Sequence, residues 1–233
     1  MLVHGLGMSS RYMMPTARLL AAAGTVHLPD MPGFGKSGKP AAALSIGELA
    51  DVLERWIKAQ GITAPIMIGN SLGAQVIADL AARYPGSVGG AVLLAPTIDP
   101  MARKRLVQIF RLARDIPREP VSLYWTAVRD YLKAGAPRLL RTLDSAIQHD
   151  IQTALSAIEV PVLLIRGARD PIIPASWMLA AAKLIPSARV VEIPGAAHAV
   201  NFNAPEAVTC EVLRFVAGNG PFETQTSGPP SGP

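Results

Sequence analysis

Short apolar segments rich in β-branched residues alternate along this chain with longer stretches whose apolar residues recur at helical spacing. The first kind of segment predicts β-strands and the second predicts amphipathic helices. Strands are expected at residues 1–4, 25–30, 64–69, 88–95, 160–166 and 188–193. Helices are expected at residues 9–23, 44–60, 72–84, 174–185 and 203–217. This alternation indicates an α/β fold with a mostly parallel, doubly wound sheet that helices cover on both faces.

One long stretch, between Pro96 and Glu159, interrupts the alternation. It has no strand pattern, and its apolar residues recur at helical spacing. Within it, residues 101–141 hold ten Lys or Arg against three acids, a net charge of +7, whereas the rest of the chain has a net charge of −2. We therefore expect a helical cap at about 97–158, inserted into a domain that spans residues 1–217. The Gly-, Pro- and Ser-rich end, 218–233, predicts a disordered tail.

Composition narrows the class of protein. The chain has 233 residues, of which 50% are hydrophobic and 17% charged, enough to bury the core of one domain. The single cysteine, Cys210, excludes an internal disulfide and a cysteine-rich zinc site, and the four histidines are scattered, so we expect no metal and no cofactor. No stretch has the layout of a membrane span or a signal peptide, so we expect a cytoplasmic protein with no membrane partner.

The strongest chemical signal is the pattern Gly69-Asn70-Ser71-Leu72-Gly73, which fits G-x-S-x-G. A predicted strand precedes it and a predicted helix follows it. In that context the pattern predicts a sharp turn that strains the serine and exposes its hydroxyl, with glycines two residues before and after so that no side chains collide. The alternative is a chance occurrence in a glycine-rich chain.

A serine nucleophile needs a base and an acid that orients the base. Asp170 follows the predicted strand 160–166, and His198 lies in a loop of small residues after the strand 188–193. Because parallel strands end at one edge of the sheet, both side chains are expected near Ser71, and the chain order is that of this fold. Taken singly, the aspartate could cap a helix and the histidine could be an ordinary loop residue.

An oxyanion hole requires two backbone N–H groups. The segment His4-Gly5-Leu6-Gly7 follows the first strand, so the N–H groups of Leu6 and Leu72 are the expected pair. The His4 side chain is expected to be structural.

The sequence resembles the α/β-hydrolase fold superfamily, in its cap-bearing branch of small esterases and carbon–carbon bond hydrolases. Five segments carry the resemblance: residues 4–7, 30–37, 69–73, 167–170 and 195–198. It implies a nucleophile at Ser71, an acid at Asp170, a base at His198 and a helical cap over the pocket.

The sequence departs from the family pattern at its beginning, because the family usually has two or more strands before the His-Gly segment. Either the fold has lost its first edge strands or the sequence begins inside a longer chain. In both cases residues 25–30 are expected to form an exposed edge of the sheet.

These observations predict a serine hydrolase that cleaves small carboxylic esters through an acyl-serine intermediate. Dehalogenase and epoxide hydrolase chemistry are disfavoured, because those relatives carry a carboxylate where Ser71 stands. Hydrolysis of a carbon–carbon bond in a diketone is the nearest alternative within the fold. A non-catalytic binding protein of the same fold is the third.

Two weaker patterns suggest nucleotide binding. Gly5-x-Gly7-x-x-Ser10 with Asp30 about twenty residues later resembles a dinucleotide-binding fingerprint, but a serine replaces the third glycine. Gly35-Lys36-Ser37 lacks the first glycine of a phosphate loop, since position 30 is Asp, and is better interpreted as a tight turn.

The cap supplies candidates for the substrate pocket. One or two of its larger apolar residues are expected to touch substrate, and the candidates are Met101, Leu106, Phe110, Tyr124, Trp125 and Tyr131, with Phe110, Tyr124 and Trp125 preferred. The basic residues of the cap indicate either solvated helix faces or arginines that face an anionic substrate or an acidic carrier protein. No aromatic platform or DNA-binding motif accompanies them, so no nucleic-acid partner is expected.

Overall fold

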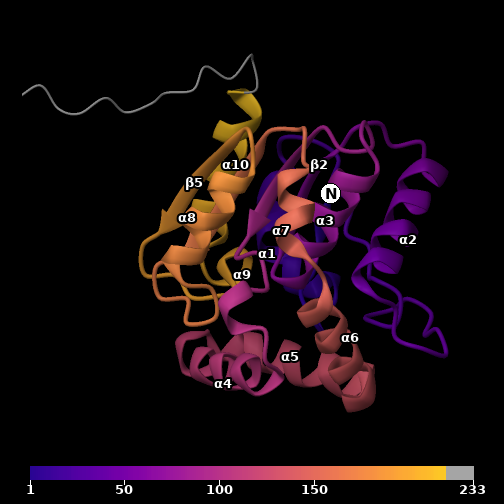
Figure 1. Cartoon of the computed structure of the whole chain (residues 1–233), viewed down its shortest axis with the longest axis vertical. Helices are drawn as coiled ribbons and strands as arrows, with labels where there is room; N and C mark the ends of the chain where they lie inside the picture. Colours follow the sequence, from indigo (N-terminus) through magenta and orange to yellow (C-terminus); the bar gives the residue numbers. More distant parts are fainter. Residues whose placement is uncertain (219–233) are drawn as a thin grey trace, which may run out of the picture.

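A computed structural model describes residues 1–218 (Figure 1). Its five strands form one sheet in the order β1-β2-β3-β4-β5, and each strand is parallel to its neighbours. The strands are β1 (Leu2–Val3), β2 (Ile66–Asn70), β3 (Gly90–Leu94), β4 (Val162–Gly167) and β5 (Ala188–Ile193). The prediction of an α/β fold with a parallel sheet is confirmed.

Helices cover both faces of this sheet. One face carries α2 (Ile46–Ala59), α3 (Leu72–Arg83), α7 (Ile151–Ser156) and α8 (Ala175–Leu184). The other carries α1 (Ser10–Leu20), α9 (Val200–Asn203) and α10 (Pro205–Ala217). The helix predicted at 203–217 corresponds to α10, and the short α9 comes directly before it. Pro205 begins α10, where its missing N–H costs no helical hydrogen bond.

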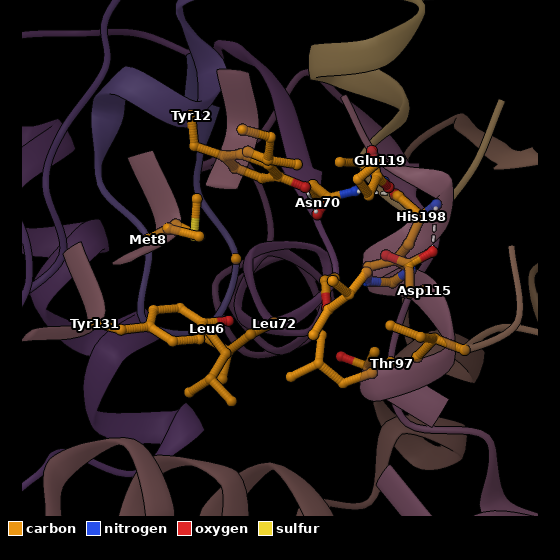
Figure 2. Close-up of a pocket in the computed structure, with 18 of the residues that line it drawn as sticks. Leu6, Met8, Tyr12, Asn70, Leu72, Thr97, Asp115, Glu119, Tyr131 and His198 are labelled. Atoms are coloured by element: carbon orange, nitrogen blue, oxygen red, sulfur yellow. Dashed lines mark hydrogen bonds between the residues drawn. The ribbon is translucent and has the colours of Figure 1, made fainter. Parts of the chain in front are cut away.

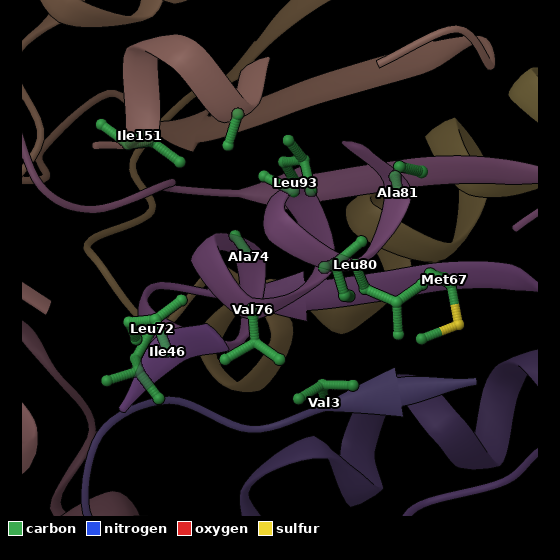
Figure 3. Packing of buried hydrophobic residues seen from close by; sticks show 14 of the residues in the cluster. Val3, Ile46, Met67, Leu72, Ala74, Val76, Leu80, Ala81, Leu93 and Ile151 are labelled. Carbon is green, nitrogen blue, oxygen red and sulfur yellow. The ribbon is translucent and has the colours of Figure 1, made fainter. Parts of the chain in front are cut away.

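The central strands are apolar along most of their length, except for Asn70 in β2 and Arg166 in β4, because alternate residues point to opposite faces that helices cover. Met67 and Leu93 pack toward α3, as Figure 3 shows, whereas Ile68 and Val92 pack toward α1 and α10. All four side chains are at most 3% exposed. Two hydrophobic clusters, one on each face, thus hold the sheet that carries the site.

The prediction of a strand at residues 25–30 is wrong. The segment runs beside β1 and accepts one backbone hydrogen bond, from Leu2 N–H to the His27 carbonyl at 2.9 Å, but it forms no ladder. β1 is only two residues long, and Pro29 has no N–H to donate, so the apolar pattern finds too few pairing partners. In the described residues the edge of the sheet is β1 itself.

The stretch predicted as a cap contains helices throughout. Two 3₁₀ turns, η1 (Pro100–Ala102) and η2 (Ile116–Arg118), accompany α4 (Arg105–Asp115), α5 (Val121–Ala134) and α6 (Ala136–Gln148). Figure 1 shows α4, α5 and α6 together at one end of the molecule. α7 instead packs on α3 and adds Ile151 and Leu155 to the core of the sheet domain. The assignment of residues 97–158 to a cap domain remains a prediction, and the name cap is used below for η1, α4, η2, α5 and α6.

Two further sequence predictions concern the C-terminal tail and the absence of a membrane-spanning segment. The tail predicted at 218–233 lies, apart from Gly218, outside the described residues. Among residues 1–218, no helix is both long enough and apolar enough to cross a membrane.

Candidate active site

Ser71 occupies a strained turn between β2 and α3. Its backbone has φ 56° and ψ −116°, in the left-handed half of conformational space that residues with a side chain rarely adopt. The turn is fixed from both sides, because Ser71 N–H donates to the Leu94 carbonyl at 2.8 Å and the Ser71 carbonyl accepts from Gln75 N–H at 3.2 Å. The residue is therefore held at the carboxyl end of β2, and its side chain lines a cavity under the cap.

The two glycines of the pattern are needed for different contacts. A Cβ at Gly69 would lie 2.5 Å from the carbonyl carbon and oxygen of Gly73, so a collision across the turn is confirmed for this position. A Cβ at Gly73 would instead lie 2.3 Å from the carbonyl oxygen of Val3 on β1. The first glycine lets the turn close, and the second lets α3 approach the neighbouring strand.

We expect Gly69→Ala to lower the free energy of unfolding by about 2 kcal/mol or more, because the added methyl group meets backbone that cannot move aside. Urea denaturation measures this change. Gly24→Ala is the control, since a Cβ at Gly24 meets nothing within 4 Å and should change stability by less than about 0.5 kcal/mol. Equal stabilities of the two variants would contradict the steric argument.

Asp170 and His198 meet although 28 residues separate them. The Nδ1 of His198 lies 2.8 Å from Oδ2 of Asp170, and both residues are buried. The other carboxylate oxygen, Oδ1, accepts the N–H groups of Ile172 at 2.7 Å and Ile173 at 3.1 Å. These three hydrogen bonds fix the carboxylate, which in turn fixes the rotation of the imidazole and leaves its Nε2 as the free ring nitrogen.

The serine and the histidine share one cavity. Ser71 and His198 both line an apolar space of about 530 Å³ beneath the cap. No hydrogen bond joins their side chains among the interactions of residues 1–218. The structure thus pairs two of the three predicted side chains directly and places the third in the wall of the same cavity.

The predicted oxyanion donors also lie at this cavity. Leu6 and Leu72 both line it, the first after β1 and the second at the start of α3. Within residues 1–218, neither backbone N–H donates a hydrogen bond to another residue. The N-terminal end of α3 adds its partial positive charge at this point, so the location is suited to an oxygen that gains negative charge.

Asn70 and Tyr12 connect the serine turn to the histidine loop, a link that the sequence analysis missed. The Tyr12 hydroxyl donates to Oδ1 of Asn70 at 2.8 Å, and Nδ2 of Asn70 donates to the His198 carbonyl at 3.1 Å (Figure 2). Burial raises the pKa of the Tyr12 phenol well above its usual value, so the hydroxyl keeps its proton and remains a donor. Asn70 lies inside the serine pattern, but nothing in the sequence singles out Tyr12.

Two buried carboxylates of the cap also hold the histidine loop. His198 N–H donates to Oδ1 of Asp115 at 3.3 Å, and Ala199 N–H donates to Oε1 of Glu119 at 2.7 Å. Oε2 of Glu119 accepts from the side-chain amide of Asn203 at 2.7 Å. Asp115 and Glu119 lie about one helical turn apart at the end of α4 and in the residues after it, and both line the cavity near His198 (Figure 2).

These carboxylates change the electrostatics of the imidazole. Burial alone lowers the pKa of His198, but the surrounding carboxylates, of which Asp170 acts most strongly, outweigh it and raise the pKa to about 9. Burial raises the pKa of the Asp115 carboxyl to about 7, and Glu119 adds to that rise although the charge of His198 opposes it. The net effect of these charges is to favour the protonated form of the imidazole.

The cavity wall from the cap is mainly apolar. Tyr124 and Tyr131 line it, in agreement with the sequence prediction, and further contacts come from residues at helical spacing on α4 and α5: Ile109, Leu112, Leu123, Ala127 and Val128. The predictions for Phe110 and Trp125 are wrong, because these side chains lie outside the cavity and are 62% and 75% exposed. Each is offset by about 100° around its helix from a residue that faces the cavity.

The basic residues of the cap do not reach the cavity. Its lining contains Asp115, Glu119 and His198 but no Lys or Arg among residues 1–218. Arg111 on α4 pairs instead with Asp99 at 3.0 Å and donates to the Ile172 carbonyl. The hypothesis that arginines contact an anionic substrate therefore has no support from the cavity wall.

The features that suggested nucleotide binding have structural roles. The Asp30 carboxylate accepts the N–H groups of Ser10 and Lys36, each at 2.6 Å, so it holds the tight turn expected at residues 35–37. His4 is also structural, since Met31 N–H donates to its Nε2 at 3.0 Å and its Nδ1 contacts the Gly5 carbonyl at 2.9 Å. In the described residues, no group of three or more His, Cys, Asp or Glu side chains is arranged so that it could hold a metal ion.

Comparisons with known proteins agree with this fold. The profile of the alpha/beta hydrolase family matches residues 1–211. The chain is 29% identical to the "Putative carbamate hydrolase RutD" of Klebsiella pneumoniae (strain 342), over 84% of this chain and 83% of that protein. It is 26% identical to a pimeloyl-(acyl-carrier protein) methyl ester esterase of Edwardsiella ictaluri (strain 93-146), over 93% and 92% of the two chains. A thermophilic esterase from Thermogutta terrifontis has the same fold, with a TM-score of 0.76 at 24% identity over 93% of this chain and 88% of that one.

Proposed function

The chain belongs to the alpha/beta hydrolase family, and from this we propose that it is a serine hydrolase that cleaves carboxylic esters through an acyl-serine intermediate. The observation that carries the proposal is the hydrogen bond between His198 and Asp170, which orients a histidine in the same cavity wall as the strained Ser71. A relative of similar length is, by its name, a methyl ester esterase.

In the proposed mechanism His198 Nε2 takes the proton of the Ser71 hydroxyl as the serine oxygen attacks the ester carbonyl. Asp170 stabilises the imidazolium that forms. The N–H groups of Leu6 and Leu72 bind the oxyanion of the tetrahedral intermediate. The imidazolium then gives its proton to the departing alcohol, and a water activated by the same histidine releases the acid from Ser71.

We propose that the substrate is a neutral ester with an apolar acyl or alcohol group. The cavity has room for a small molecule, and among residues 1–218 its mainly apolar wall offers no Lys or Arg to an anionic group. Two buried carboxylates near His198 further disfavour negative charge at this place. The basic residues on the outer surface of the cap are therefore not part of the proposed substrate site.

Labelling with a fluorophosphonate probe and a panel of p-nitrophenyl esters of increasing chain length test the proposal. We expect stoichiometric labelling at Ser71 and turnover of uncharged esters above that of esters with a carboxylate on the acyl chain. Absence of labelling would favour the non-catalytic reading of the fold. Turnover of a vinylogous diketone but of none of the esters would replace ester cleavage with carbon–carbon hydrolysis.

The electrostatics of His198 predict an alkaline activity profile. A general base must be unprotonated, and kcat/KM follows the free enzyme, so kcat/KM should rise with pH up to about 9. In Asp115→Asn one of the charges that favours the imidazolium is gone, while the amide oxygen can still accept His198 N–H. The rise should therefore move to lower pH in this variant.

The pH profile of kcat/KM measures this shift. Asp144→Asn is the matched control, because Asp144 lies on the cap but pairs with Arg105 at the surface, so its profile should coincide with that of the parent protein. An unchanged profile in Asp115→Asn would show that this carboxylate does not act on the base. The other charged groups that face His198 are Asp170 and Glu119.

A further inference from the structure

The outer side of the cap exposes an unusual number of large apolar side chains. Among residues 1–218, fifteen large hydrophobic residues are exposed, and eleven of them lie between residues 101 and 140. The most prominent are Met101, Leu106, Trp125 and Leu132, each at least 75% exposed. We call the exposed side chains of η1, α4 and α5 the cap face. Large apolar side chains that are exposed together in one region indicate a binding surface.

In residues 101–141 the acidic side chains and the basic side chains differ in burial. Its three acids, Asp115, Glu119 and Asp130, are all turned inward and are at most 8% exposed. The Ser9 hydroxyl donates to Asp130 at 2.6 Å, and backbone N–H groups occupy the other two.

The Lys and Arg side chains of residues 101–141 are exposed or partly exposed. The exposed ones include Lys104, Arg114, Arg129 and Lys133. Asp144, which follows the segment on α6, is engaged by Arg105. The cap face is therefore both apolar and cationic, without exposed acids of its own.

The cap face also surrounds an entrance to the cavity. Ile109, Ile116, Val128 and Leu132 line the cavity and are at the same time 44% to 79% exposed. They come from α4, the turn after it and α5, the elements that form one end of the molecule in Figure 1. Whatever covers the cap face therefore lies against the opening through which substrate enters.

Contrary to the expectation from the sequence that the protein has no membrane partner, we propose that the cap face docks on an anionic lipid surface and takes its ester from there. A second copy of the chain is a poor occupant, because two cationic faces repel each other. Apolar side chains that project among Lys and Arg on two adjacent helices match the acyl boundary and the headgroups of a bilayer, where the basic stems extend toward phosphate. An acidic protein would match the charge, but it would cover the opening, whereas a lipid layer can deliver an amphiphilic ester through it.

Docking of the cap face on lipid does not depend on the mechanism of hydrolysis. Only the delivery of an ester to the cavity rests on the proposed function. The protein carries three tryptophans, of which Trp125 is 75% exposed on the cap face, Trp177 is 4% exposed and Trp56 lies partly buried on α2. The Trp125 indole is thus a reporter at the proposed contact. Its fluorescence should shift to the blue when it leaves water for the lipid interface.

Co-sedimentation with vesicles tests the docking on the full chain. We expect at least about tenfold stronger partition onto phosphatidylcholine vesicles that contain phosphatidylglycerol than onto phosphatidylcholine alone, with the preference lost at high salt. Anionic vesicles should shift the tryptophan emission of the parent protein to the blue, but not that of Trp125→Phe. The same partition by both vesicle types, or an unchanged emission, would overturn the proposal.

Paired charge variants locate the contact. The double variant Arg129→Gln/Lys133→Gln removes two exposed cations of α5 and should weaken partition onto anionic vesicles by more than about tenfold. The control Arg18→Gln/Arg55→Gln removes two exposed cations of α1 and α2 and should leave partition unchanged. Equal losses in the two variants would show a general charge effect and refute docking through the cap face.

Two further measurements separate the outcomes. Ser71→Ala should bind vesicles as the parent does. Vesicle binding by a parent protein that hydrolyses no ester would reject the proposed function and keep the docking. Conversely, turnover of soluble esters with no vesicle binding would keep the function and reject the docking. Binding to an acidic polypeptide such as polyglutamate, with no binding to anionic vesicles, would assign the cap face to a protein partner instead.

Discussion

Replacement of Ser71 by alanine should lower kcat for p-nitrophenyl esters by about 10³-fold or more, because the oxygen that attacks the carbonyl is removed. The stability should change by less than about 0.5 kcal/mol, since the side chain makes no hydrogen bond among residues 1–218 and alanine keeps the same Cβ at the strained φ. Steady-state kinetics together with urea denaturation separate loss of chemistry from loss of fold.

A second Ser→Ala variant is the control for any general effect of this substitution on activity. Ser176 is exposed on α8, so Ser176→Ala should retain the parent kcat. The fluorophosphonate probe should label Ser176→Ala and the parent protein, and leave Ser71→Ala unlabelled. Esterase activity in Ser71→Ala close to that of the parent would refute the assigned nucleophile.

Asp170→Asn should lower kcat by about 10⁴-fold, the size of effect seen when the orienting carboxylate of a serine protease triad becomes an amide. The asparagine oxygen can still accept the N–H groups of Ile172 and Ile173, so the loop should keep its shape. What is lost is the negative charge beside His198 Nδ1, and with it the tautomer and the stabilised imidazolium.

Glu159→Gln serves as the control for this change, because Glu159 is exposed in the loop before β4 and its kcat should stay at the parent value. Thermal unfolding of both variants verifies that the fold is intact. A decrease in kcat of less than tenfold in Asp170→Asn would mean that another group orients the histidine, and the nearest carboxylate to examine next is Asp115.

The sequence was sufficient to predict the parallel sheet and the position of Ser71, because both depend on local pattern. An apolar strand, a glycine on each side of the serine and a following helix are all within a few residues of one another. Asp170 and His198 could be selected as candidates because parallel strands deliver their carboxyl ends to one edge. The hydrogen bond between them could not be predicted with certainty, because it depends on how two loops pack in three dimensions.

The incorrect predictions share a dependence on distant partners. Residues 25–30 have the composition of a strand, but a strand needs a neighbour of matching length, and β1 offers two residues. Phe110 and Trp125 lie on helices, as predicted, but helical spacing does not say which side of a helix faces the cavity. Asp115 could not be recognised, because its significance lies in a backbone N–H 83 residues away.

The hydrogen bonds from the histidine loop to Asp115 and Glu119 mean that the cap is not an interchangeable accessory of this enzyme. Chimeras that exchange the segment for the corresponding helices of a relative would have to supply new acceptors for two amide groups of that loop. Without them the loop would retain its link to Asp170 but lose its support from above. Divergence of this segment in evolution, or its redesign in the laboratory, is therefore constrained at those two positions.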